Sequence, residues 1–169
     1  MPVLVACVGN PLVSDDGAGP AVYRALKDRP RPAGTRLLLL STAGLRLVEE
    51  LTDERGLIVV DAVRLGGRPG TVHVLDWEQL PPRPNRPALS SHGLSVREAV
   101  ELRRRLYPAA SPQWVRLVGI EGECFDEFAD MTPAVSAAID PAATIVLEQA
   151  AALGNEKPAG QARPAEKAQ

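Results

Sequence analysis

Short apolar runs, separated by stretches with helical periodicity, constrain the fold of this chain more than any other feature. Residues 3–8 read VLVACV, residues 36–40 read RLLLL and residues 57–60 read LIVV. Continuous apolar runs of this length are typical of parallel strands that are covered on both faces. We expect an edge strand at residues 71–75 and a last strand at residues 115–120.

Helical patterns fill the stretches between these strands. We expect helices at residues 18–27 and 45–51, a third that ends near residue 106, and a fourth that begins at Thr132-Pro133 and ends near residue 153. Threonine suits the cap position of the fourth helix and proline suits its first turn. Strands that alternate with helices predict a three-layer α/β/α fold on a twisted, mostly parallel sheet of about five strands. The expected apolar face is Ala18, Val22 and Leu26 in the first helix, and Val96, Val100 and Leu106 in the third.

The length of 169 residues fits one domain, which we place at residues 1–153. Residues 154–169 lack apolar periodicity and are rich in Pro, Gly, Ala, Glu and Lys, so we expect a disordered tail. Residues 77–91 contain four prolines and no helical or strand pattern. A loop of this length in a compact domain is usually functional, and we interpret residues 77–87 as a surface lid or docking loop.

Composition excludes several classes of protein. With 19 basic and 21 acidic side chains, the net charge of −2 gives no support to nucleic-acid or polybasic membrane binding. Two cysteines cannot build a disulfide framework, a Cys-rich zinc site or an iron–sulfur cluster. The sequence has neither an apolar stretch of membrane-spanning length nor a charged leader, so we expect a cytoplasmic protein. Nothing in it demands an oligomer, and we expect a monomer.

Polar residues follow the predicted strands, where ligands of open α/β sheets bind. Asp15 and Asp16 come after the first strand, Asp61 after the third, and His92 stands just before a helix. Each also has a structural interpretation, as a helix cap, a strand end or an exposed histidine. Together, Asp16, Asp61 and His92 form a set of oxygen and nitrogen donors that leaves coordination positions open and suits nickel or zinc.

The remaining reactive residue types have simpler interpretations. We expect His73, inside a strand, to be structural or exposed, and Cys7 to be a buried core thiol. Cys124 has no visible activating base. Ser90 and Ser91 precede His92, but no G-x-S-x-G elbow supports a serine hydrolase.

Four motifs occur in order: GNPLVSDDGAG (residues 9–19), STAGL (41–45), VVDA (59–62) and SSHGL (90–94). Over about residues 3–150, the chain resembles the maturation endopeptidases of [NiFe] hydrogenases. The resemblance implies a protease that trims a C-terminal extension from the hydrogenase large-subunit precursor once nickel is installed. It also implies that Asp16, Asp61 and His92 bind metal and recognise nickel that the precursor supplies, while another divalent ion can occupy the site in the free protein.

The expected reaction is metal-dependent peptide hydrolysis. Nickel could act as a template, as a Lewis acid or as a source of activated water. Asp15 is a candidate general base. The main alternative is a non-catalytic, nickel-dependent chaperone of the same precursor. A signalling receiver domain is disfavoured, because it needs a lysine after the last strand and none occurs between Lys27 and Lys157. A nucleotide-binding domain is disfavoured, because no glycine-rich phosphate loop follows the first strand.

Overall fold

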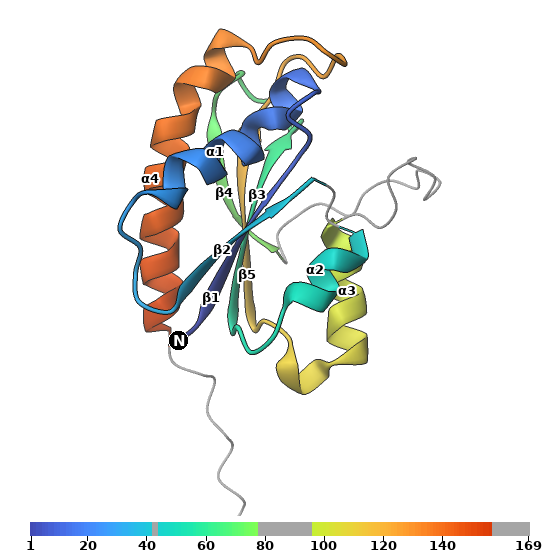
Figure 1. Ribbon diagram of the computed structural model, residues 1–169, viewed down its shortest axis with the longest axis vertical. Coiled ribbons are helices and arrows are strands. Elements are labelled where there is room, and N and C mark those ends of the chain that lie inside the picture. Colours follow the sequence, from blue (N-terminus) through green and yellow to red (C-terminus); the bar gives the residue numbers. More distant parts are fainter. Residues whose placement is uncertain (42–43, 78–95, 157–169) are drawn as a thin grey trace, which may run out of the picture.

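A five-stranded sheet forms the centre of the computed structural model, which describes residues 1–41, 44–77 and 96–156 (Figure 1). The strand order is β2-β1-β3-β5-β4. Four strands are parallel and β4 runs antiparallel to β5 at the edge, which confirms a mostly parallel sheet. The strands are β1 (Val3–Val8), β2 (Thr35–Leu40), β3 (Gly56–Val63), β4 (Val72–Asp76) and β5 (Trp114–Glu121).

Two helices cover each face of the sheet, which makes the three layers visible in Figure 1. The helices α1 (Ala18–Lys27) and α4 (Pro133–Asn155) pack on one face, and α2 (Gly44–Glu50) and α3 (Val96–Leu106) pack on the other. Because side chains alternate along a strand, each strand serves both cores, and this explains the continuous apolar runs. In β1, the residues that face α1 and α4 are Val3, Val5 and Cys7, and those that face α2 and α3 are Leu4, Ala6 and Val8.

The expected apolar face of the first helix is confirmed, and that of the third is partly wrong. Ala18, Val22 and Leu26 are all buried. In α3, Val100 is buried but Leu106 is 56% exposed. Each helical residue rotates the chain by about 100°, so a side chain six residues after Val100 points to a different face. Arg103, three residues after Val100, takes the inward position and donates to the carbonyl oxygen of Val48 at 3.0 Å.

Strand β3 is longer than expected. It continues through Asp61 to Val63, because β5 is equally long and pairs with it along its whole length. Asp61 lies opposite Gly119, and Val63 lies opposite Glu121. Asp61 and Glu121 therefore belong to strands rather than to the loops that follow them.

Trp77 also departs from expectation. We expected it to begin a surface loop, but it is only 5% exposed and packs in the core beneath α2 and α3. A large aromatic side chain directly after β4 buries more apolar area there than it would in a loop. Residues 78–95, which hold the rest of the predicted lid or docking loop, lie outside the described residues.

Two glycines allow the chain after β1 to pack closely on the sheet. A Cβ atom at Gly19 would lie 1.9 Å from the carbonyl oxygen of Val8. Gly9 has φ +138°, and a Cβ atom there would lie 2.0 Å from the carbonyl oxygen of Asp16. Any other side chain at either position would push α1 and the turn before it away from β1.

The last helix is two residues longer than expected. Helix α4 includes residues 154 and 155, which we expected in the tail, because Leu153 is fully buried and the Met1 amino group donates to the carbonyl oxygen of Gly154. Residues 157–169, the remainder of the predicted tail, lie outside the described residues. Within the described part of the chain, no helix is both long enough and apolar enough to cross a membrane.

Candidate functional site

The first two predicted site residues lie at the carboxyl edge, the edge of the sheet where β1, β3 and β5 end. A short 3₁₀ helix, η1 (Ser14–Gly17), follows β1 and contacts β3. Asp16 lies in η1 and Asp61 lies near the end of β3. The fold therefore brings these two carboxylates, 45 residues apart in sequence, to the same edge.

One carboxylate oxygen of Asp16 accepts a hydrogen bond that fixes the side chain, and the other oxygen is available to bind a ligand. Its side chain is partly buried, and its Oδ2 atom accepts a hydrogen bond from the Asn10 backbone N–H at 2.6 Å. The Asn10 side chain in turn accepts from the Leu12 N–H at 3.0 Å. Within the described residues, the Oδ1 atom of Asp16 accepts no hydrogen bond. This carboxylate thus has a fixed orientation and one oxygen that can bind a cation.

Asp15 differs from its neighbour, because its side chain is fully buried and both its oxygens are bonded. Oδ2 accepts the backbone N–H groups of Glu123 (2.8 Å) and Cys124 (2.9 Å), and Oδ1 accepts the N–H (2.7 Å) and hydroxyl (2.9 Å) of Thr132. Burial alone would raise the pKa of Asp15, but these hydrogen bonds outweigh burial and lower it. The geometry favours a structural role for Asp15, and its predicted role as general base stays a prediction.

These bonds also change the interpretation of Thr132. It occupies the cap position of α4 and Pro133 the first turn, as expected. However, the Thr132 hydroxyl bonds Asp15 and makes no capping hydrogen bond to its own helix. Asp15 therefore joins η1 to the start of α4 and to the loop between β5 and α4.

The structure does not place the third predicted metal ligand, because His92 lies outside the described residues. Asp61 is partly buried in β3. Within residues 1–41, 44–77 and 96–156, no group of three or more His, Cys, Asp or Glu side chains is arranged to hold a metal ion. The predicted set of Asp16, Asp61 and His92 therefore stays a prediction.

A second buried carboxylate at this edge, Glu121, was missed as a structural element by sequence reasoning. Its Oε1 atom accepts the backbone N–H groups of Leu65 and Gly66, both at 2.9 Å, and its Oε2 atom lies 2.9 Å from Nε2 of His73. Burial raises the pKa of Glu121, but the hydrogen bonds from Leu65, Gly66 and His73 outweigh it and lower the pKa. The only feature of the sequence that could have indicated this role of Glu121 is its position as an acidic residue at the end of an apolar strand.

The contact with Glu121 fixes the side chain of His73 on one face of the sheet. Asp61 and His73 both pair with Gly119, from opposite sides of β5, so the three residues form one row across the sheet. Residues in such a row project to the same face. His73 thus lies on the same face of the sheet as Asp61, two strands away, and is anchored to Glu121.

The cysteines are both free thiols. Cys7 is fully buried in the core, and burial raises its pKa to about 12, so it is protonated at neutral pH and is not a nucleophile. Cys124 is partly buried, and its backbone N–H is one of the donors to Asp15.

Known proteins resemble this chain over most of its length. The family model described as hydrogenase maturation protease (HycI) matches residues 20–149. The hydrogenase 2 maturation protease of Escherichia coli K12 is 32% identical over 149 residues, which cover 87% of this chain and 89% of the relative. The hydrogenase expression/formation protein HoxM of Azotobacter vinelandii is 30% identical over 154 residues, 90% of this chain and 73% of the relative.

Solved structures agree with these relatives. The hydrogenase maturating endopeptidase HybD from E. coli superposes with a TM-score of 0.74 at 31% identity, over 88% of this chain and 91% of HybD. The [NiFe] hydrogenase maturation protease HybD from Thermococcus kodakarensis gives a TM-score of 0.71 at 25% identity, over 89% of this chain and 99% of that protein. The matches in sequence and in structure agree with each other, and the chain belongs to the hydrogenase maturation protease family.

Proposed function

We propose that this protein is an endopeptidase that removes the C-terminal extension of a [NiFe] hydrogenase large-subunit precursor after nickel insertion. One observation carries the proposal: η1 and β3 bring Asp16 and Asp61 to the carboxyl edge of a fold shared with maturation proteases. Asp61 and residue 92 also lie inside the segment that the family model matches.

In the proposed reaction, nickel arrives as part of the substrate. Asp16 offers its Oδ1 atom, which accepts no hydrogen bond from the described residues, and Asp61 offers a second carboxylate from β3. His92 would complete the set with an imidazole nitrogen. Carboxylate and imidazole donors suit a borderline divalent ion such as nickel, and three protein ligands leave room for groups from the precursor.

The hydrogen bond from the Asn10 backbone N–H prepares the Asp16 carboxylate to bind the metal. It fixes the orientation of the carboxylate before the precursor binds, so little side-chain entropy is lost on binding. Once bound to the two proteins, nickel would place the scissile bond, polarise its carbonyl group or lower the pKa of a water molecule.

Intact-mass spectrometry of the precursor tests the proposal. Nickel-loaded and nickel-free precursor are each incubated with the protein, and a mass loss equal to a C-terminal peptide is expected only in the nickel-loaded sample. We expect Asp16→Ala, Asp61→Ala and His92→Ala to abolish this loss while circular dichroism stays unchanged. Glu148→Gln, which changes an exposed acid on α4, is the matched control and should cleave normally.

The same measurement separates the alternative function. A non-catalytic chaperone would form a complex with the nickel-loaded precursor without any loss of mass. Full activity in all three variants would remove these residues from the mechanism. Neither binding nor cleavage of correctly loaded precursor would contradict the proposed function as a whole.

A further inference from the structure

Two exposed apolar side chains lie together at the carboxyl edge. Leu12 is 60% exposed and Phe128 is 82% exposed. The Phe128 backbone N–H donates to the Leu12 carbonyl oxygen at 2.7 Å, so the two residues are neighbours although 116 positions separate them. We call Leu12 and Phe128 the apolar pair.

The backbone beneath the apolar pair is held in place from several sides. Val13 forms a β-bridge with Glu127, and the Ser14 hydroxyl donates to the carbonyl oxygen of Asp130 at 2.8 Å. The hydrogen bonds to Asp15 fix both ends of the same loop. The loop is therefore already ordered before a partner binds. Binding is favoured because no conformational entropy is lost in ordering the loop.

Phe128 is unusual in its backbone as well as in its exposure. Its φ angle of +61° lies in the left-handed region, which aromatic residues rarely adopt and which costs on the order of 1 kcal/mol or more. Folding thus gains little from this side chain, because it is strained and lies in water. A large aromatic residue presented in this way is typical of a contact point in a protein interface.

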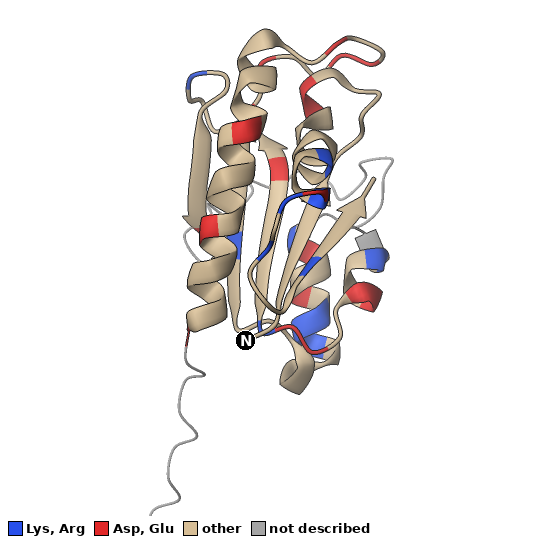
Figure 2. Ribbon diagram, turned by 60° about the vertical axis from the view of Figure 1, so that its left-hand side comes forward, with Lys and Arg blue, Asp and Glu red and all other residues tan. Residues whose placement is uncertain are grey.

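The surroundings of the apolar pair are acidic. Figure 2 shows acidic residues along the loop between β5 and α4, beside η1. Asp126, Glu127 and Asp130 are exposed, and in the described part of the chain none of them forms an ion pair. We call these three residues the acidic rim. A partner that covers the apolar pair must meet this negative charge with basic side chains.

The apolar pair is continuous with the candidate site. The Leu12 N–H donates to the Asn10 side chain, and the Asn10 N–H donates to Asp16. A protein bound at Asp16 therefore lies beside Leu12. A second copy of this chain is a poor occupant, because a two-fold contact would place one acidic rim against the other.

We propose that the apolar pair and the acidic rim dock the large-subunit precursor, through an apolar depression on the precursor that is flanked by Lys and Arg side chains. This inference rests on the proposed function, since it concerns the same substrate at the same edge. The docking surface holds the folded precursor, while Asp16 and Asp61 face the metal.

The variant Phe128→Gly tests the docking surface without weakening the fold. Glycine adopts a positive φ without strain, so the variant should keep or raise the melting temperature. We expect its KM for nickel-loaded precursor to rise at least tenfold, with kcat within twofold of the wild type. Leu12→Ala should raise KM less. The matched control is Leu106→Ala, an exposed leucine on α3 (56% exposed), whose kinetics should not change.

Salt dependence tests the acidic rim. For the wild type, KM should increase with NaCl concentration, and the triple variant Asp126→Asn, Glu127→Gln, Asp130→Asn should show a flatter dependence. An unchanged KM in Phe128→Gly and Leu12→Ala, with active wild type, would overturn the docking surface and leave the proposed function intact. Concentration-dependent dimers that Phe128→Gly abolishes would assign the apolar pair to a second copy instead. A wild type that neither binds nor cleaves the precursor would overturn both proposals.

Discussion

The two edges of the sheet stabilise buried carboxylates in different ways. At the amino edge, where the parallel strands begin, Glu54 is 4% exposed and accepts a hydrogen bond from Nε of Arg36 at 2.7 Å, while Arg36 also bonds Glu50 at 3.2 Å. At the carboxyl edge, Asp15 and Glu121 accept mainly backbone N–H groups. At the amino edge a cation pairs with the buried Glu54, whereas at the carboxyl edge backbone dipoles satisfy most of the oxygens of Asp15 and Glu121, with His73 as a further partner of Glu121.

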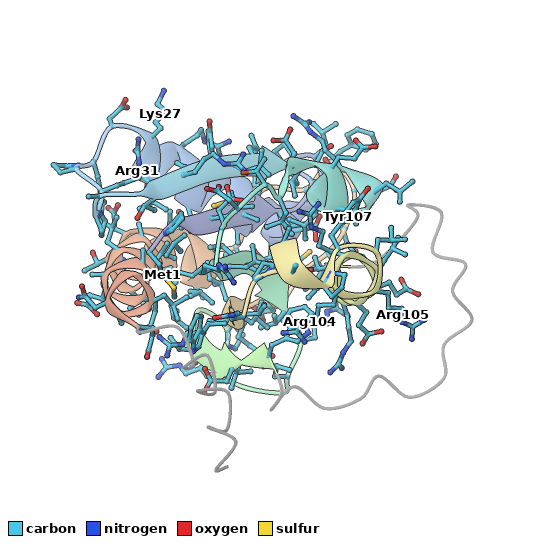
Figure 3. The ribbon with its side chains drawn as sticks, turned by 90° about the horizontal axis from the view of Figure 1, so that it is seen from below. Met1, Lys27, Arg31, Arg104, Arg105 and Tyr107 are labelled. Atoms are coloured by element: carbon cyan, nitrogen blue, oxygen red, sulfur yellow. The ribbon has the colours of Figure 1, made fainter. Side chains whose placement is uncertain are left out.

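Basic residues are found at both edges. At the carboxyl edge, Arg64 follows β3 and its guanidinium lies 4.3 Å from the ring centroid of Phe125. Figure 3, which looks at the amino edge, shows Lys27, Arg31, Arg104 and Arg105 there, whereas the acidic rim lies at the other end (Figure 2). Buried negative charge at the carboxyl edge adds to that of Asp16, Asp61 and the rim. The buried carboxylates and the exposed acids of the rim favour a positively charged partner at this edge, whether a metal ion or a basic protein surface.

The largest change in the free energy of unfolding is expected from a substitution that breaks the hydrogen bonds of Asp15 at the carboxyl edge. Asp15→Ala leaves three backbone N–H groups and one hydroxyl without their buried acceptor. We expect the free energy of unfolding to fall by about 3 kcal/mol, since each unsatisfied buried group costs about 1–3 kcal/mol and water satisfies some of them. Urea unfolding followed by circular dichroism measures this loss.

Asp16→Ala is the matched control for that experiment. It removes one acceptor from a partly buried position, so we expect a loss below about 1 kcal/mol together with loss of processing. Equal destabilisation by the two substitutions would contradict the structural role of Asp15 and the different role proposed for Asp16.

The next effect concerns the amino edge. Arg36→Ala should lower the free energy of unfolding by about 1–2 kcal/mol, because Glu54 loses its cation but keeps the Thr52 N–H at 2.8 Å. In 1 M NaCl the destabilisation should shrink, since Arg36 is partly exposed and its ion pairs are screened. The Asp15→Ala loss should not shrink, and a similar salt response at both edges would remove the distinction.

Acid pH provides a smaller test. The pKa values of Asp15 and Glu121 are lowered from their ordinary values of 3.8 and 4.5, so their stabilisation is present above these values and is lost as pH falls through the lowered ones. We expect stability to be nearly constant from pH 7 to about 5 and to fall below about pH 4.5. Glu121→Gln should reduce the slope of this acid limb, and an unchanged slope would contradict the assignment.

The smallest effect concerns the acidic rim. Neutralising Asp126, Glu127 and Asp130 together should change the free energy of unfolding by less than about 0.5 kcal/mol, because these side chains are exposed and unpaired within the described residues. Thermal unfolding measures this. A large loss of stability would show that the rim supports the fold rather than a partner.

The fold could be predicted because it depends on local patterns. Strand β1 begins and ends at the expected residues, and α1 buries the three expected side chains, since apolar runs and helical periodicity directly report burial. The extension of β3 could not be read in the same way. Asp61 is a poor strand residue, and only its pairing with Gly119 keeps it in the ladder.

The edge of the sheet where the polar residues gather could be predicted from the sequence, but their hydrogen bonds could not, and a site formed by Asp16, Asp61 and His92 stays a prediction. Polar residues after parallel strands meet at one edge, and this brings Asp16 and Asp61 to the same edge. Which of Asp15 and Asp16 is buried depends on how η1 turns against β3, and adjacent acids look alike in sequence. The role of Glu121 depends on the turn at residues 64–70, whose backbone N–H groups carry no signature of their own.

The contact between the Met1 amino group and Gly154 has a practical consequence for anyone who engineers this protein. Met1 lies at the amino edge, at the end of the domain opposite the start of α1 (Figure 1), and Gly154 is hydrogen-bonded to it. A fluorophore, affinity handle or surface linker attached near either residue would leave open the face that we propose meets the precursor. The same proximity makes the chain suitable for circular permutation, because a short linker can join residue 1 to residue 154.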